Sequence, residues 1–351
     1  MILVDGSMGE GGGQILRSAI TISTLIGKPV EVINIRSNRK DPGLKQQHVS
    51  TIQLISKLFD INIENVAVGA KWIKFKAHKN LEIASVNSNL VIDIGTAGSI
   101  PLLLQTIIPI ISIFQKNLTL RIQGGTDVKY SPTIDYIKYV LREILSRIGI
   151  IFDINVIKRG FYPNGQGIVD VQIEKISELH TIEFCNFKDT QPNIISIAGK
   201  LPRHVPDRQI GYAITTLEKR GIKPIKHKST IETAESPGSS ILVYSTSESG
   251  MYLGADSIGE KGIKAETIGY NAATKFISDY ESRVCIDQFL ADMLVLPLSF
   301  VKGGSKYKIS TVTNHLTTNL ELIKRINGLD YSINKVGEKE FIVSITGRPL
   351  I

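Results

Sequence analysis

The stretch DGSMGEGGGQILRSA, Asp5 to Ala19, combines a glycine-rich turn with side chains that can bind phosphate. Glycine is used where the backbone turns sharply or approaches a ligand closely. Free N–H groups and the helix dipole favour an anion where such a turn enters a helix. Glu10 lies in the turn, and Gln14 and Arg17 follow at a spacing that puts them on one helix face. The stretch predicts a phosphate-binding turn; the alternative is a tight strand-to-helix turn without a ligand.

Histidine is a second source of chemistry, because a neutral imidazole is a competent nucleophile near neutral pH. His315 stands in TNHLTTN, between an expected strand and an expected helix, where it would be exposed at the end of an element. The alternative for any histidine is a surface or packed residue. The residues alone place His315 only modestly ahead of His48 and His204 as a candidate.

The net charge and the number of cysteines limit the classes of protein to which this chain can belong. The 351 residues include 41 Lys+Arg and 33 Asp+Glu, a net charge of +8, which fits a nucleic-acid or phosphorylated partner without deciding for one. The two cysteines form no CxxC pair, so a disulfide framework and a thiolate zinc site are excluded. We expect a cytoplasmic protein, because the chain starts without the pattern of a signal peptide.

The most apolar run, residues 100–114, is too short to span a bilayer. We interpret it as a buried helix with Ser99 as its N-cap and a kink at Pro109. Standard nucleotide motifs are missing from the chain. No GxxxxGK[ST] occurs, and the only Asp-Gly pair, Asp5-Gly6, lacks the lysine of a Lys-x-Asp-Gly nucleophile.

The order of expected elements repeats along the chain. A strand, a glycine turn, a helix and a strand are followed by a second helix and alternating strands, with the second helices at 43–59 and 131–148. A third copy, with helices at 287–300 and 316–326, closes the chain. The fold class expected is α/β (α+β): three repeated α/β units of pseudo-threefold arrangement with a smaller inserted α/β domain. The catalytic domain would span 1–182 plus 284–351, and the insert 183–283.

Seven segments together resemble the RNA 3'-terminal phosphate cyclase family, archaeal type, over nearly the whole chain in order. They are DGSMGEGGGQILRSA, RKDPGLKQQH, GTAGSIPLLLQT, GGTDVKYSPTIDY, RGFYPNGQG, FLADMLVLPL and NHLTTNLELI. The resemblance implies an ATP-dependent enzyme that acts on RNA with a 3'-phosphate end. In this family a histidine takes AMP from ATP, AMP passes to the 3'-phosphate, and the 2'-OH closes a 2',3'-cyclic end. The family's three repeated units and small inserted domain agree with the repeats above.

The resemblance also implies roles for individual residues. His315 matches the nucleophile, and Glu10 matches a metal-binding carboxylate suited to Mg²⁺ or Mn²⁺. The polar contacts to ATP and its phosphates match Gln14, Arg17, Arg39, Gln47 and Gln105. The alternatives are a first-turn glutamate that favours the helix dipole and, for Arg39, a solvated basic turn. Arg36 and Lys40 in that turn could follow an RNA backbone.

Two further matches would sandwich adenine, Pro132 and Phe289, where Phe289 replaces the family's more usual tyrosine. Stacking would survive this change and the phenolic hydrogen bond would be lost. The same stretch supplies the remaining nucleotide contacts, Leu290, Ala291, Asp292 and Met293, with methionine where some relatives carry glutamine. The alternative for 289–297 is an amphipathic core helix.

Two other functions fit parts of the pattern. Cyclase-like relatives that lack the nucleophile act as non-catalytic RNA-processing or ribosome-assembly proteins; His315, Glu10 and Arg17 favour the enzyme instead. Enolpyruvyl transferases have similar repeats, but the HLTTN segment and the basic charge argue against that class.

Overall fold

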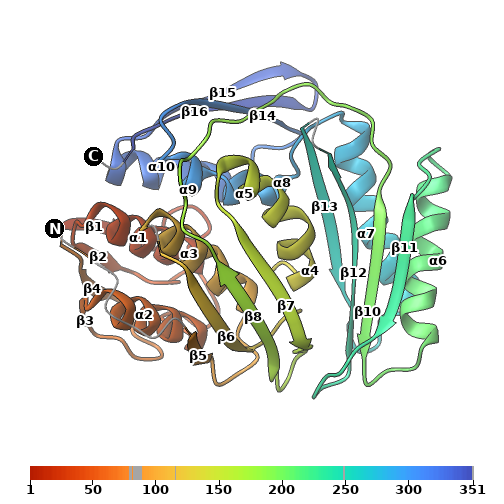
Figure 1. The fold of residues 1–351 in the computed structure, drawn as a ribbon, viewed down its shortest axis with the longest axis horizontal. Helices are drawn as coiled ribbons and strands as arrows, with labels where there is room; N and C mark the ends of the chain where they lie inside the picture. Colours follow the sequence, from red (N-terminus) through yellow and green to blue (C-terminus); the bar gives the residue numbers. More distant parts are fainter. Residues whose placement is uncertain (79–80, 82–88, 115, 248–249, 350–351) are drawn as a thin grey trace.

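A computed structural model describes residues 1–78, 81, 89–114, 116–247 and 250–349 (Figure 1). Three of its sheets have four strands each in the same arrangement, with the first two strands parallel and the other neighbours antiparallel. The first sheet has the order β1 (Ile2–Asp5), β2 (Val30–Ile33), β4 (Ile73–Lys76), β3 (Asn62–Glu64). The second has the order β5 (Asn89–Asp93), β6 (Leu118–Gly124), β8 (Gly167–Ile173), β7 (Phe152–Lys158). The third has the order β9 (Glu183–Phe184), β14 (Gly303–Ile309), β16 (Glu340–Gly347), β15 (Asp330–Gly337). The predicted mixed α/β fold with three repeated units is thus confirmed.

Each unit adds helices to its sheet, and one extended apolar core connects the three. The first unit has α1 (Gly13–Ile26) and α2 (Gln46–Phe59). The second has α3 (Ile100–Ile113), α4 (Ile134–Tyr136), a π-helical turn η1 (Ile137–Leu141) and α5 (Arg142–Ile148). The third has α8 (Gln288–Met293), α9 (Val295–Leu298) and α10 (Asn314–Asn327).

Two expected helices differ from the structure. The helix expected at 131–148 begins at Ile134, because Thr133 caps it by accepting from Tyr136 N, and a π-helical turn interrupts it. The helix expected at 287–300 is broken between α8 and α9. Pro297 lacks the N–H that a continuous helix would donate to Met293, which favours the break. The predicted helix over 100–114 is confirmed, with Ser99 as its cap.

A fourth sheet lies at one end of the molecule, with its two helices on the outer face (Figure 1). Its strand order is β11 (Lys226–Ile231), β10 (Asn193–Gly199), β12 (Gly238–Ser247), β13 (Met251–Ile258). Helices α6 (His204–Glu218) and α7 (Ala265–Glu281) pack on it and on each other, around a separate apolar cluster. The proposed division into a domain of 1–182 plus 284–351 and an insert of 183–283 stays a prediction.

The third sheet is built from residues that come before and after the fourth sheet in the chain. Its edge strand β9 precedes the fourth sheet in the chain, yet Glu183 and Phe184 pair with Lys306 and Tyr307 of β14. After α7 the chain returns to the same place, where Cys285 N donates to Lys308 O at 3.1 Å. Glu183 and Phe184 therefore belong to the third sheet. Within the described ranges, no helix has the length and apolar character needed to cross a membrane.

Candidate active site

His315 lies in the first turn of α10, beside the glycine-rich turn that precedes α1. Thr313 caps α10 by accepting from Leu316 N at 3.0 Å, which fixes the start of the helix. The imidazole is 40% exposed and lies between two carboxylates. Its Nε2 is 2.9 Å from Glu10 Oε2, and its Nδ1 is 3.8 Å from Asp292 Oδ2. The structure thus brings two predicted site residues, Glu10 and Asp292, to the imidazole of a third, His315.

Gln14 connects the three helices that meet here. Its Nε2 donates to Asp292 Oδ2 at 3.1 Å and to the carbonyl oxygen of His315 at 3.3 Å. Asn319 extends this link, because its Nδ2 donates to Asp292 O at 2.9 Å and its Oδ1 accepts from Ser18 Oγ at 2.6 Å. Sequence reasoning missed Asn319. Its position could have indicated a role, because Asn319 follows His315 by one helical turn on the same face of α10.

Asp292 and Arg17 form the buried side of this group. Burial raises the pKa of Asp292 to about 7, although Arg17 and the hydrogen bond from Gln14 oppose the rise. Burial lowers the pKa of Arg17 to about 10, against the attraction of Asp292. Asp292 therefore changes its charge near neutral pH, next to Nδ1 of His315.

Arg39 reaches the same turn from the loop after β2. Its Nη2 lies 3.4 Å from Glu10 Oε2, with both side chains 42% exposed. Arg36 is used differently, because its Nη1 donates to the carbonyls of Asp41 at 2.8 Å and Gly43 at 3.1 Å. These bonds make Arg36 part of the turn itself, so they do not favour the hypothesis that it follows an RNA backbone.

His48 is buried behind the start of α1. Its Nδ1 accepts from Lys45 N at 3.0 Å, and burial together with Arg17 lowers its pKa to about 3. The ring is therefore neutral and carries its hydrogen on Nε2, for which the described residues offer no acceptor. A Cβ added at Gly13 would lie 2.5 Å from this nitrogen. His48 supports the turn of Gly13, and its burial makes it a poorer candidate nucleophile than His315.

Gln47 joins the first unit to the second. Its Oε1 accepts from Ser99 N at 3.0 Å, and Ser99 Oγ is 2.5 Å from Ser131 Oγ, next to Pro132. Gln105 lies in α3, and its buried Nε2 has no hydrogen-bond partner among the described residues. A buried amide without a partner is unusual in a folded protein. The predicted contact of Gln105 with the nucleotide stays a prediction.

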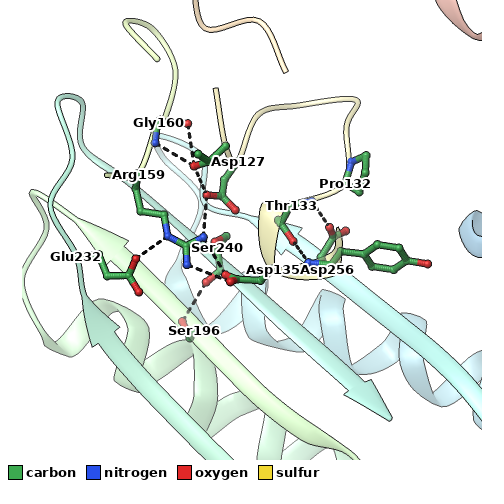
Figure 2. Close-up of polar contacts among 12 residues, drawn as sticks. Asp127, Pro132, Thr133, Asp135, Arg159, Gly160, Ser196, Glu232, Ser240 and Asp256 are labelled. Carbon is green, nitrogen blue, oxygen red and sulfur yellow. Dashed lines mark hydrogen bonds and ion pairs between the residues drawn. The ribbon is translucent and has the colours of Figure 1, made fainter. Parts of the chain in front are cut away.

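Pro132 and Phe289, the two predicted walls of the adenine site, are attached to the same strand. Thr133 N, after Pro132, donates to Asp256 Oδ2 at 2.7 Å (Figure 2). Phe289 N donates to Asp287 Oδ1 at 2.9 Å, and Asp287 Oδ2 accepts from Gly254 N at 2.9 Å. Gly254 and Asp256 both belong to β13, so the fourth sheet helps to position both walls. Phe289 itself is 45% exposed.

A buried ion cluster supports the segment that carries Pro132 (Figure 2). Arg159 follows β7, and its guanidinium lies 3.3 Å from Asp127, 2.9 Å from Asp135 and 2.7 Å from Glu232. The Arg159 side chain is only 3% exposed. The attraction of Asp135 and Asp127 outweighs the effect of burial and raises the pKa of Arg159. Sequence reasoning missed this cluster, because its members are spread along the chain.

The other predicted contacts in α8 lie mainly in the core. Leu290 and Ala291 are buried, and Ala291 O accepts from Tyr307 Oη at 2.9 Å. Met293 is half-buried and packs against the core. Nucleotide contacts by these three residues stay predictions. A cavity of about 370 Å³ lies beside α8, and its lining includes Gln288, which precedes Phe289, and Thr311, four positions before His315.

The acidic residues of the candidate site could hold a cation only if a bound substrate and water supplied some of its ligands. The described part of the chain has no group of three or more His, Cys, Asp or Glu side chains that could hold a metal ion. Glu10 offers one exposed carboxylate at the glycine-rich turn. Mg²⁺ is commonly held by one or two carboxylates, several waters and substrate phosphates. The residues present therefore fit such a cation.

Comparisons with known proteins give one family. A family model described as RNA 3'-terminal phosphate cyclase matches residues 8–333. An RNA 3'-terminal phosphate cyclase from Pyrococcus furiosus is 38% identical over 343 residues, which cover 97% of each chain. One from Saccharolobus islandicus is 40% identical over 346 residues, 97% of this chain and 98% of the relative. One from Pyrobaculum aerophilum is 37% identical over 336 residues, 94% of each chain.

Proposed function

The chain belongs to the RNA 3'-terminal phosphate cyclase family, a family of enzymes, and we propose that it converts an RNA 3'-terminal phosphate to a 2',3'-cyclic phosphodiester with ATP. The reaction passes through a covalent adenylyl-histidine at His315 and an RNA-3'-pp-5'-A intermediate. The observation that carries the proposal is the position of His315. It is an exposed imidazole with Nδ1 toward Asp292 and Nε2 toward the turn of Glu10.

The first step forms the adduct. Nε2 of His315 attacks the α-phosphorus of ATP, so a P–N bond forms, the bond to the β-phosphate oxygen breaks and pyrophosphate leaves. Asp292, when ionised, attracts the hydrogen on Nδ1 and so favours the tautomer with a free electron pair on Nε2. Glu10 must leave its position at Nε2 before this attack, since its Oε2 lies 2.9 Å from the nucleophilic nitrogen.

The next two steps use the RNA. An oxygen of the RNA 3'-phosphate attacks the α-phosphorus of the adduct, and the P–N bond breaks. The vicinal 2'-OH then attacks the activated 3'-phosphorus, loses its proton, and AMP leaves. The 2'-oxygen is already held close to the phosphorus, and such proximity lowers barriers by about 7–11 kcal/mol in well-oriented cases.

The surrounding residues have binding and positioning roles in this proposal. Arg17 and Arg39 neutralise the phosphates, Gln14 adds a polar contact at the start of α1, and Gln47 supports the facing loop. Glu10 would hold a divalent cation, Mg²⁺ or Mn²⁺, which when bound supplies charge neutralisation at the phosphates. Pro132 and Phe289 enclose adenine, and the unpartnered Nε2 of Gln105 gives the nucleotide a donor.

A labelling experiment tests the function. The protein is incubated with ATP labelled at the α-phosphate, or in a parallel sample at the γ-phosphate, and with Mg²⁺ or Mn²⁺. It is then analysed on a denaturing gel. We expect label from the α position only, and release of that label as AMP when an RNA with a 3'-phosphate is added. A protein that takes no label and forms no cyclic end would instead be a non-catalytic member of the family.

A further inference from the structure

A second cavity, of about 560 Å³, opens between loops of the second unit and a loop of the fourth-sheet segment, by which we mean residues 185–284. We call it the second-unit cavity. Its lining residues are polar or small: Gly95, Thr96, Pro163, Asn164, Gln166 and Glu235. The side chains of Thr96, Asn164 and Gln166 can each donate and accept hydrogen bonds, as the edges of nucleobases can.

The loops around this cavity are packed in place. A Cβ added at Gly165 would lie 2.7 Å from Ala97 Cα, so the two loops touch through their backbones. Asn164 N donates to Ser236 Oγ at 3.2 Å, and Gln123 Nε2 donates to Gln166 Oε1 at 2.6 Å. The second-unit cavity is therefore a built feature and not a gap between loose segments.

Two lysines lie at the rim of the cavity. Glu235 is the one acidic lining residue, and it lies 3.1 Å from Lys158 and 3.7 Å from Lys200. The hydrogen bond from Lys158 lowers the pKa of Glu235, so the carboxylate stays charged at neutral pH. Asp93 accepts from Gly95 N at 2.7 Å, so a second carboxylate lies beside the lining. Lys158 and Lys200 are the cationic groups that a phosphate backbone could contact here.

Two aromatic rings on neighbouring loops, one of which lines the cavity, are exposed to solvent to an unusual extent. Tyr162 precedes the lining residue Pro163 and is 78% exposed, and Tyr130 is 97% exposed. The bridge between Asp127 and Phe161 brings their two loops next to each other. Proteins bind single-stranded RNA by stacking unpaired bases on such rings.

The loop that lines one side of the cavity packs on the first unit. A Cβ added at Gly98 would lie 3.0 Å from Gln47 Cβ, so the loop of Gly95 and Thr96 also reaches the phosphate-facing residues. On the other side, Tyr130 is two positions before Pro132. Next to Gln47 and Pro132, two predicted nucleotide contacts, the surface therefore offers hydrogen-bonding groups, two lysines and two exposed rings.

We propose that the second-unit cavity, with Tyr130 and Tyr162, binds the unpaired nucleotides immediately upstream of the RNA 3'-phosphate. Their bases stack on the two tyrosines, and their backbone contacts Lys158 and Lys200. This inference rests on the proposed function for the identity of the RNA. It assigns the RNA path to the second unit and the fourth-sheet segment, away from the turn of Arg36.

Binding is measured without ATP, so that catalysis does not enter. A short unpaired RNA with a 3'-phosphate and a fluorophore at its 5' end is titrated with the full-length protein, and anisotropy gives the Kd. Tyr130→Ala and Tyr162→Ala should each weaken binding by about 5- to 100-fold, in line with the loss of one stacked base. Tyr130→Phe and Tyr162→Phe should retain the wild-type Kd, because a phenyl ring also stacks. Tyr212→Ala on α6 is the matched control, since Tyr212 is 52% exposed on a helix of the fourth sheet.

Labelling by ATP alone, measured on the same proteins, separates this inference from the proposed function. Wild-type labelling of both alanine variants together with weakened RNA binding supports the inference. A Kd equal to that of the Tyr212→Ala control overturns it, whatever the labelling shows. If the wild-type protein takes no label, the proposed function fails, and the anisotropy still decides where RNA binds.

Discussion

Glu10 Oε2 lies 2.9 Å from Nε2 of His315, although the two residues are 305 positions apart in the chain. The same carboxylate is also 3.4 Å from Arg39 Nη2. Glu10 thus contacts the nitrogen that we propose as nucleophile, and it is also the residue that we propose as the metal ligand. A cation that binds this carboxylate would compete with the imidazole for it. In the proposed mechanism, metal binding and release of Nε2 would therefore be coupled through the side chain of Glu10.

The coupling predicts how Glu10→Ala changes adenylylation. We expect the rate of labelling by α-labelled ATP to fall most at low Mg²⁺ or Mn²⁺, and the loss to diminish as the metal concentration rises. The reason is that the variant loses a ligand and keeps the nucleophile. The measurement is the initial rate of labelling over a metal titration. Equal slowing at every metal concentration would mean that Glu10 acts only on the helix or the imidazole.

His315→Ala tests the nucleophile itself. Labelling by α-labelled ATP should be abolished, because no other group is proposed to form the P–N bond. His204→Ala and His48→Ala should keep labelling, with His48→Ala at reduced thermal stability because a buried ring is removed. An adduct that persists in His315→Ala would assign the nucleophile to another residue.

Asp292 predicts a pH dependence of stability in the absence of ATP. Its folded-state pKa of about 7 is above the ordinary value of 3.8, so the folded protein binds a proton that the unfolded chain has lost. The contribution of Asp292 to the free energy of unfolding is therefore fully present below about pH 4, and it is lost as the pH rises from 4 toward 7. The fall is at most about 1.4 kcal/mol per pH unit.

Asp292→Asn isolates this effect. Urea unfolding of both proteins between about pH 4 and pH 8 should show a shallower decline for the variant. Asp287, whose pKa burial also raises to about 7, remains in both proteins and cancels in the comparison. Parallel curves would show that the Asp292 pKa is not raised in the folded state.

Phe289 predicts the behaviour of the adenine site. Phe289→Ala should raise the KM for ATP in adenylylation by about tenfold, because one aromatic wall is lost. This factor corresponds to the usual binding free energy of one stacked base. Phe289→Tyr keeps the ring and should leave the KM equal or lower. Phe289 is 45% exposed, so neither change should lower the melting temperature by more than a few degrees. An unchanged KM in Phe289→Ala would place adenine elsewhere.

The repeated fold was accessible from the sequence because each unit carries its own local signals. Alternating strands, capped helices and glycine turns recur in the same order, and the structure has the same strand order in three sheets. The helix breaks were harder to foresee. Pro297 sits in an apolar run that is typical of one helix, but its missing N–H favours the break between α8 and α9.

The candidate site was accessible only in part. Glu10, Gln14 and His315 were expected from motifs, and their contacts in the structure agree with a shared site. Asn319 and the Arg159 cluster were not expected, because the residues that they contact are distant in the chain. Asp135 and Glu232, for example, become neighbours only when the second unit packs on the fourth-sheet segment.

The chain contacts strand β14 just before and just after the fourth-sheet segment. Phe184 pairs with Tyr307, and Cys285 N donates to Lys308 O. The roughly hundred residues between Phe184 and Cys285 therefore depart from and return to adjacent points. An excursion with adjacent ends can be lengthened, shortened or exchanged without altering the frame to which it is attached. The segment is nevertheless tied to the second unit, because Glu232 pairs with Arg159 and Asp256 accepts from Thr133 N. Its removal would leave the first strand of the third sheet in place, but would take away β13, on which both walls of the proposed adenine site depend.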